Sequence, residues 1–262
     1  MMNGNRFIDG IKVAFLDVLL PIVVYILVTI FVSGISGAID YFFSYKLNII
    51  IVTAIASLLT TIILLPRYIR IVNNRQYYID KFDIKNMRYI LGLGVSLCLF
   101  FNIALILLNI IQNDQAAIQV SDSIMELNPL VAFISVSIIV PMCEELIFRG
   151  FVFKGIEHKT NFIIGAFVSS ILFALMHGNI SQGIYAFCIG FVLCYVYNRF
   201  GGLKYSYLLH LIMNFSSLVF MPAFVPDEAL KRDQLIVLIV SFVLFIITAY
   251  RLKQTEIKKE VM

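Results

Sequence analysis

The sequence has few charged residues for its length, and its few cysteines are not arranged as ligands or disulfide partners. Only 14% of the 262 residues are charged, whereas a soluble domain carries about 25%. The composition excludes a soluble domain, a disordered chain and a disulfide scaffold. The cysteines lie in apolar runs without a CxxC pair, so we expect small buried hydrophobic residues at Cys98, Cys143, Cys188 and Cys194.

Hydrophobic residues make up 61% of the chain, and the mean hydropathy is +0.94. A helix needs about 20 apolar residues to cross a bilayer. The sequence therefore predicts an all-α, polytopic integral membrane protein, with a single membrane domain over residues 1–262. Two of the eight predictions are weak, because the fifth and sixth spans are separated by almost no loop and the seventh is short and interrupted by polar residues. The spans are 11–35, 47–65, 89–112, 129–153, 161–178, 180–198, 205–221 and 234–250.

Lysine and arginine fall mostly on one side of this eight-span arrangement. Seventeen of the 20 lie on the side of the N-terminus, and only Lys46, Lys231 and Arg232 lie on the other. The positive-inside rule then predicts that both termini are cytoplasmic. The basic loop 66–88 is expected to rest on anionic lipid, so the predicted partner is the lipid bilayer and not a nucleic acid. Ile-, Asn- and Lys-rich usage favours a bacterial plasma membrane.

Ionisable and strongly polar residues are concentrated in spans four to seven. In the first three spans, Asp17 and Asn102 are interpreted as local hydrogen-bonding or interface residues. Burying several ionisable groups separately in a membrane is costly, so those of the later spans are expected to share one pocket that water can reach. They are Glu144, Glu145, Arg149, His177, His210 and Asn214.

Helical spacing gives these residues provisional roles. Glu145 and Arg149 are four residues apart, so they share a helix face and are expected to form an ion pair. Glu144 is rotated by about 100° and lacks that partner, which suits a general base. His210 and Asn214 are again four residues apart and present two polar groups from one stripe.

The position of His177 fits this pocket less well. Phe173 lies one turn earlier and is expected to brace the imidazole. Counted along the predicted spans, however, Glu144 and His210 lie near the cytoplasmic ends, and His177 lies near the far end. A tilted or displaced fifth span would bring the three residues together.

One glutamate, two histidines and an asparagine around a water form a hydrolytic set. Glu144 would take a proton from water, and His177, His210 or Asn214 would hold the oxyanion. Glu144, His177 and His210 would alternatively match a His₂Glu zinc site. No HExxH sequence occurs. We therefore favour chemistry without a metal or other cofactor, with zinc as the alternative.

Three segments resemble the motifs of one family. EELIFR at 144–149 resembles the EExxxR motif of the CPBP family of CAAX proteases and bacteriocin-processing enzymes, also called the Abi family. FALMH at 173–177 matches its FxxxH, and HLIMN at 210–214 matches its HxxxN. All three lie in the predicted catalytic core, 129–221, which holds the whole resemblance.

The resemblance implies an eight-helix intramembrane endopeptidase, a hydrolase acting on a membrane-associated peptide or protein. By motif position, Glu144 would activate water, Glu145 and Arg149 would support it, and His177, His210 and Asn214 would complete the site. Relatives process prenylated CAAX proteins, peptide pheromones or bacteriocins. The alternatives are a non-catalytic membrane scaffold, a bacteriocin self-immunity protein, or a small transporter with a proton relay.

Overall fold

The protein is built from helices joined by short turns in the part of the chain that the computed structural model describes, residues 14–75, 84–220, 222 and 231–255. No strand occurs in these residues, which confirms the all-α prediction. The elements, in chain order, are the π-helix η1 (Ala14–Leu19), α2 (Leu20–Phe43), α3 (Ile49–Arg75), α4 (Ile84–Leu107), the 3₁₀ turn η2 (Ile111–Asn113), α5 (Gln115–Met125), α6 (Pro129–Ala132), the π-helix η3 (Phe133–Ile139), α7 (Val140–Glu145), the π-helix η4 (Leu146–Phe153), α8 (Lys154–Lys159), α9 (Phe162–Leu175), α10 (Ile180–Phe200), α11 (Leu203–Phe220) and α12 (Lys231–Gln254).

Six of the described helices are long and apolar enough to cross a membrane, which confirms a polytopic membrane protein. They are Leu16–Phe43, Ile49–Asn73, Asn86–Leu107, Pro129–Lys159, Ile180–Phe200 and Arg232–Gln254. The two weak predictions are helical, but α9 has only 14 residues and α11 only 18, so a count of eight spans is not confirmed. The first span runs further than predicted, to Phe43, and residues 11–13 of its predicted range lie outside the described residues.

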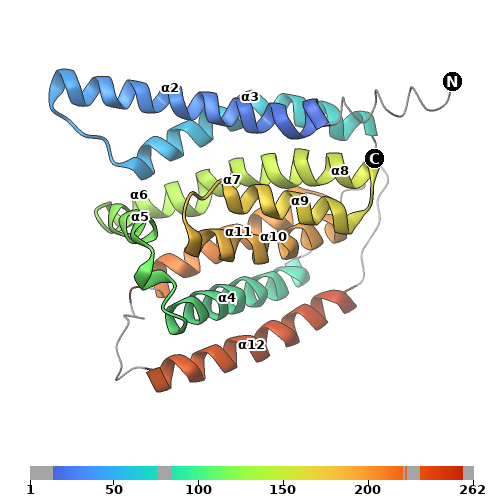
Figure 1. The fold of residues 1–262 in the computed structure, drawn as a ribbon. Helices are drawn as coiled ribbons and strands as arrows, with labels where there is room; N and C mark the ends of the chain where they lie inside the picture. Colours follow the sequence, from blue (N-terminus) through green and yellow to red (C-terminus); the bar gives the residue numbers. More distant parts are fainter. Residues whose placement is uncertain (1–13, 76–83, 221, 223–230, 256–262) are drawn as a thin grey trace.

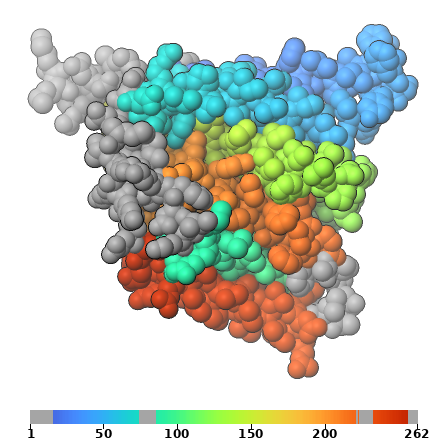
Figure 2. Space-filling model, turned by 180° about the vertical axis from the view of Figure 1, so that it is seen from behind, coloured from blue at the N-terminus to red at the C-terminus, as the bar shows by residue number. Residues whose placement is uncertain are grey.

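The helices form layers on either side of the long helix Pro129–Lys159, which consists of α6, η3, α7, η4 and α8 (Figure 1). One flank consists of α2 and α3, and α4 and α12 form the other, with α9, α10 and α11 between (Figure 1). Seen from behind, the blue α2–α3 layer and the red α12 again occupy opposite edges (Figure 2). The outermost helices α2 and α12 bury 11% of their most apolar stretch, compared with 50% for the predicted third span.

The long helix is irregular because of its sequence. Pro141 lies at the start of α7 and has no amide hydrogen, so it leaves a carbonyl one turn earlier without its usual donor. The backbone on both sides of α7 is π-helical, in η3 and η4, and such wide turns occur frequently at functional sites. The two glutamates of the predicted site therefore lie on a short α-helical segment between two distorted ones.

A helix that the sequence did not predict follows the third span. That span ends at Leu107, five residues earlier than predicted, and the next helix is α5, Gln115–Met125. Asp114 caps α5 by accepting a hydrogen bond from the Ala117 amide, 3.2 Å away. Its second carboxylate oxygen accepts one from the Ser181 amide, 2.7 Å away, at the start of α10. One carboxylate thus joins the first turns of two helices.

Helix caps and small residues fix α9 and α10 against the long helix. The Asn161 side chain caps α9, and the Asn179 side chain caps α10. A Cβ atom at Gly190 would lie 2.6 Å from the Ser170 hydroxyl, so only glycine permits this approach of α10 to α9. Ser169 donates a hydrogen bond to the Phe148 carbonyl at 2.7 Å, which ties α9 to η4.

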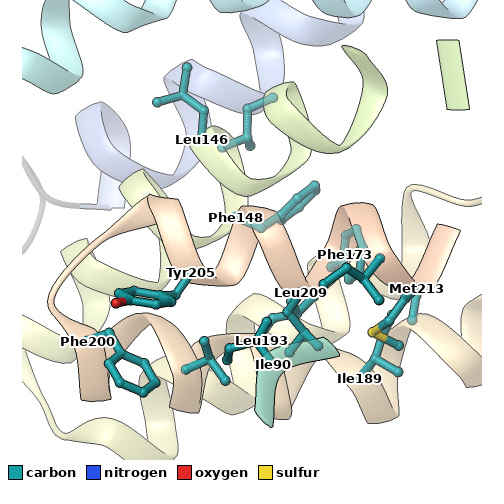
Figure 3. Packing of buried hydrophobic residues seen from close by; sticks show 14 of the residues in the cluster. Ile90, Leu146, Phe148, Phe173, Ile189, Leu193, Phe200, Tyr205, Leu209 and Met213 are labelled. Carbon is teal, nitrogen blue, oxygen red and sulfur yellow. The ribbon is translucent and has the colours of Figure 1, made fainter. Parts of the chain in front are cut away.

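The largest buried cluster lies where η4, α9, α10 and α11 meet. In Figure 3, Phe148, Phe173 and Leu209 come from three of these helices and lie close together. The rings of Phe148 and Phe173 are 5.1 Å apart between centroids. The helices that form this apolar cluster also carry residues of the predicted polar site.

Candidate active site

The carboxylate of Glu145 and the guanidinium of Arg149 form the buried base of the site. Arg149 Nη1 lies 2.9 Å from Glu145 Oε1, and both side chains are almost completely excluded from solvent. The guanidinium also lies over the Phe173 ring, with 4.3 Å between its central carbon and the ring centroid. The ion pair predicted from the four-residue spacing is confirmed.

His210 on α11 lies between the two carboxylates of α7. Its Nδ1 is 3.0 Å from Glu145 Oε1, and its Nε2 is 3.6 Å from Glu144 Oε2. Because an ionised carboxylate only accepts hydrogen bonds, the contact with Glu145 places a proton on Nδ1 and directs Nε2 toward Glu144. The Glu145–Arg149 pair thereby orients the imidazole with respect to Glu144.

The two neighbouring glutamates have different environments. The Glu145 side chain is 1% exposed, whereas that of Glu144 is 19% exposed. Glu144 is separate from Arg149, as the helical rotation predicted, but it is not isolated because it faces His210. The more accessible carboxylate is therefore the one with which Arg149 does not pair.

Both imidazoles contact the same aromatic ring. Phe173 lies 4.8 Å from His177 and 5.7 Å from His210 between ring centroids, with edge-on geometry in each case. His177 Nδ1 donates a hydrogen bond to the Phe173 carbonyl, 2.8 Å away, which directs Nε2 away from its own helix. The predicted bracing of His177 by Phe173 is confirmed.

The sequence predicted that His177 and Glu144 lie at different depths because it ended the fourth span too early. That span was predicted to end at 153, but its helix continues to Lys159. Glu144 therefore lies 16 residues before the turn at Thr160, and His177 lies 16 residues after Asn161, just beyond the end of α9 at Leu175. The two residues are thus the same number of positions from the turn that joins their helices.

Asn214 lies one turn beyond His210 but bonds to the backbone of the long helix. Its Nδ2 donates to the Val136 carbonyl at 2.9 Å. In a π-helical pattern the amide of residue 141 would donate to the carbonyl of Val136, five residues earlier. Because Pro141 has no amide hydrogen, that carbonyl is left without a backbone donor. Tyr207, also on α11, donates to the Ile138 carbonyl at 3.2 Å. Helix α11 thus supplies donors to the irregular segment, as membrane helices with prolines require.

The described residues contain no group of three or more His, Cys, Asp and Glu side chains arranged to hold a metal ion. The alternative zinc ligands, Glu144, His177 and His210, therefore do not form such a group, although Phe173 lies beside both histidines.

The remaining polar residues behave as the sequence predicted. Asp17 contacts Arg67 at 3.4 Å, which joins η1 to α3. Asn102 donates to the Cys98 carbonyl of its own helix at 2.9 Å. The cysteines are free; Cys98, Cys143 and Cys194 are buried as predicted, whereas Cys188 is only partly buried.

The sequence interpretation missed a second polar surface beside Glu144. Tyr25 on α2 lies within electrostatic range of Glu144 and near the hydroxyls of Thr29 and Ser57. Ser57 and Thr60 lie on one face of α3 and are fully buried. The signal was present in the sequence as hydroxyl residues at helical spacing in an apolar span, but such residues are common in membrane helices.

The fold and this cluster define a class: a polytopic helical membrane protein with carboxylates and imidazoles buried against one another inside the bundle. Residues 126–216, which contain all six predicted site residues, match the family described as type II CAAX prenyl endopeptidase Rce1-like. This match confirms the family resemblance inferred from the three motifs.

Two curated proteins are similar over part of their length. One is named "Putative membrane peptidase YdiL", from Bacillus subtilis strain 168, and is 31% identical over 39% of this chain and 40% of that protein. The other is the UPF0177 protein YxdF of Lactococcus lactis subsp. lactis strain IL1403, 35% identical over 29% of this chain and 42% of that protein. The matched region thus spans about two fifths of each relative. No solved structure matches the chain.

Proposed function

We propose that the protein is an intramembrane endopeptidase that hydrolyses a peptide bond in a membrane-associated peptide or protein. The observation that carries the proposal is the position of His210, whose Nδ1 contacts Glu145 while its Nε2 faces Glu144. The family match and the peptidase named among the relatives support the same class of reaction.

In this proposal Glu144 is the general base. It is the more accessible carboxylate, and no arginine among the described residues pairs with it. Glu144 takes a proton from a water, and the resulting hydroxide attacks the peptide carbonyl carbon. The oxyanion is stabilised by the second N–H of Asn214, or by an Nε2–H of His177 or His210, which exists only when that imidazole carries a proton on both nitrogens. Collapse of the intermediate breaks the C–N bond, and the proton on Glu144 passes to the leaving amine.

The other residues position these groups. Arg149 neutralises Glu145, and Glu145 fixes the ring of His210. Asn214 holds the irregular backbone before α7 through the Val136 carbonyl, and its second N–H remains available as a donor. Phe173 sets the orientation of both imidazoles.

The substrate class follows from the location of the site. The site residues belong to helices within the apolar bundle, so a substrate that is already in or on the bilayer reaches them most directly. The family resemblance points to a prenylated CAAX-type substrate or a peptide pheromone or bacteriocin precursor. The Ile-, Asn- and Lys-rich composition favours a bacterial protein, and with it a peptide pheromone or bacteriocin precursor as the substrate.

Comparative peptidomics of cells with the parent protein and with the Glu144→Gln variant tests the proposal. We expect specific peptides to disappear from the variant, with an uncleaved precursor accumulating in the membrane fraction. Identical peptide profiles from equally abundant proteins would contradict the activity. A phenotype that survives Glu144→Gln but not deletion of the protein would favour the scaffold or self-immunity alternatives.

The role of zinc is tested separately with the purified protein. In the proposed metal-free mechanism, cleavage continues after exhaustive chelation. Loss of cleavage on chelation, with recovery at one equivalent of zinc, would favour the alternative in which Glu144, His177 and His210 are ligands.

The proposed location is a bacterial plasma membrane, with both termini on the cytoplasmic side. The charge asymmetry supports this orientation, although several of the basic residues lie outside the described residues. These are Arg6, Lys12, Lys81, Lys258 and Lys259. Terminal tags that become accessible only after the membrane is opened would agree with this orientation. Tags accessible from the outside would contradict it.

A further inference from the structure

His177 lies in the turn between α9 and α10, outside the regular part of either helix. Helix α9 ends at Leu175, and α10 begins at Ile180. The last carbonyls of a helix have no donor within that helix, so a turn that follows it needs donors from elsewhere. The contacts that hold the His177 backbone therefore decide where its imidazole lies.

The side chain of Asn179 supplies a donor to this turn. Its Nδ2 donates a hydrogen bond to the His177 carbonyl, 3.2 Å away, and another to Gln182 Oε1, 2.7 Å away. Its Oδ1 accepts a hydrogen bond from the Gln182 amide at 2.9 Å, which caps α10. An asparagine side chain offers two N–H groups and one carbonyl oxygen, and all three are used here. Asn179 thus ties the His177 backbone to the first turn of α10.

The other polar group of the His177 backbone is bonded as well. The His177 amide donates a hydrogen bond to the Ala174 carbonyl at 3.2 Å. Gly178 then adopts a φ of 70°, in the left-handed region that favours glycine, and the chain turns toward α10. The His177 backbone is therefore held from two sides, by the end of α9 and by the Asn179 side chain.

The first turn of α10 is itself fixed by a helix that is distant in the sequence. Asp114 Oδ2 accepts hydrogen bonds from the Ser181 amide at 2.7 Å and from the Ser181 hydroxyl at 2.9 Å. Asp114 also caps α5. Ser181 is buried and lies two residues after Asn179. The turn from which Asn179 reaches His177 is thus joined to α5.

We infer that Asn179 is a positioning residue for His177, holding its backbone so that the imidazole stays against Phe173. Two contacts depend on this position: the 2.8 Å hydrogen bond from Nδ1 to the Phe173 carbonyl and the edge-on contact with the Phe173 ring at 4.8 Å. The same ring lies beside His210 and Arg149. The positioning of His177 does not depend on the reaction, whereas its catalytic consequence rests on the proposed function.

Capping and positioning can be separated, because a cap does not require asparagine. Serine caps a helix about as well as asparagine, and threonine nearly as well. Neither side chain has an N–H group to donate to the His177 carbonyl. Asn161 provides a matched control, because it caps α9 by accepting a hydrogen bond from the Ile164 amide at 3.0 Å. It lies at the opposite end of α9 from His177.

Nuclear magnetic resonance of the full-length protein in detergent, with ¹³C-labelled histidine, tests the inference. The chain has three histidines, so three imidazole signals are assigned with His158→Gln and His177→Gln. We expect Asn179→Ser to shift or broaden the His177 signal and to leave that of His158, which is exposed in α8, unchanged. Asn161→Ser should leave the three signals in place. Should Asn179→Ser not fold, Asn179→Thr provides the same comparison.

An unchanged His177 signal in Asn179→Ser, or an equal change in Asn161→Ser, would overturn the inference. The spectra need no substrate, so the result is independent of the proposed endopeptidase activity. With an active parent, Asn179→Ser should lower kcat several-fold and leave KM unchanged, because an oxyanion is stabilised only in the transition state. A displaced His177 signal with unchanged kcat would uphold the positioning and contradict the part of His177 in the proposed reaction.

Discussion

The two carboxylates of α7 differ in their partners and in their exposure. Glu145 forms an ion pair with Arg149, contacts Nδ1 of His210 and is almost inaccessible. Glu144 faces Nε2 of His210 at 3.6 Å, and its side chain is 19% exposed. Adjacent residues of one helix thus give one carboxylate a structural environment and the other an environment suited to chemistry. The difference arises from the rotation of about 100° between consecutive helical positions.

The strongest test of this comparison is removal of the Glu144 carboxylate. Glu144→Gln should lower cleavage by about 10²–10⁴-fold, the usual contribution of a positioned base. The thermal midpoint of the purified protein should barely change, because Glu144 is the less buried partner. Cleavage assays and thermal unfolding in the same detergent measure the two effects.

Glu157→Gln is a matched control for that variant, because Glu157 pairs with Lys154 in α8, outside the site. It should cleave like the parent. A Glu144→Gln protein that is active, or one that is inactive only because it unfolds, would remove the proposed distinction between the two glutamates.

The opposite side of α7 should respond in stability. Arg149→Met leaves the Glu145 carboxylate buried without its cation, which costs about 3–5 kcal/mol. The double variant Arg149→Met/Glu145→Gln should recover part of this loss, since no unpaired charge remains. Lys154→Met, which breaks the more exposed pair with Glu157, should cost at most about 1 kcal/mol. Equal stability of Arg149→Met and the parent would show that the buried pair is not a structural element.

Much of this arrangement was predictable from the sequence, and the reasons for the misses are physical. The spacing of Glu145 and Arg149 and of Phe173 and His177 gave correct contacts because both depend only on helical periodicity. The length of the fourth span was underestimated because α8 is polar yet still helical, which misplaced Glu144 in depth.

Contacts between distant helices were not predictable in the same way. The hydrogen bond from Asn214 to the Val136 carbonyl depends on how α11 crosses the segment before Pro141, which no local pattern encodes. The buried face of Ser57 and Thr60 likewise depends on which side of α3 meets α7. Helix α5 was not predicted because its sequence is too polar for a membrane span.

Asn214 provides a test of a smaller effect on the α11 side. Asn214→Leu removes the donor to the Val136 carbonyl and should destabilise the protein by about 1–3 kcal/mol. Asn102→Leu is the matched control, because Asn102 bonds to the Cys98 carbonyl within its own regular helix. Chemical unfolding of both variants gives the comparison. If Asn102→Leu were as destabilising as Asn214→Leu, the Val136 carbonyl, which Pro141 leaves without a backbone donor, would need a side-chain donor no more than a carbonyl in a regular helix does.

Asp114 extends the comparison of paired carboxylates to one outside the membrane-spanning helices. The hydrogen bond from the Ser181 backbone amide, aided by the Ser181 hydroxyl and the Ala117 amide, holds the pKa of Asp114 below its ordinary value. A lowered pKa in the folded state means that the ionised form stabilises the fold. That contribution is complete above the ordinary aspartate pKa of about 3.9 and is lost as the pH falls further, through the folded-state pKa. Asp114→Asn should therefore lower the thermal midpoint slightly at pH 7, and the difference from the parent should shrink at acidic pH. A difference that stays constant or grows on acidification would mean that the carboxylate charge does not stabilise the joined first turns of α5 and α10.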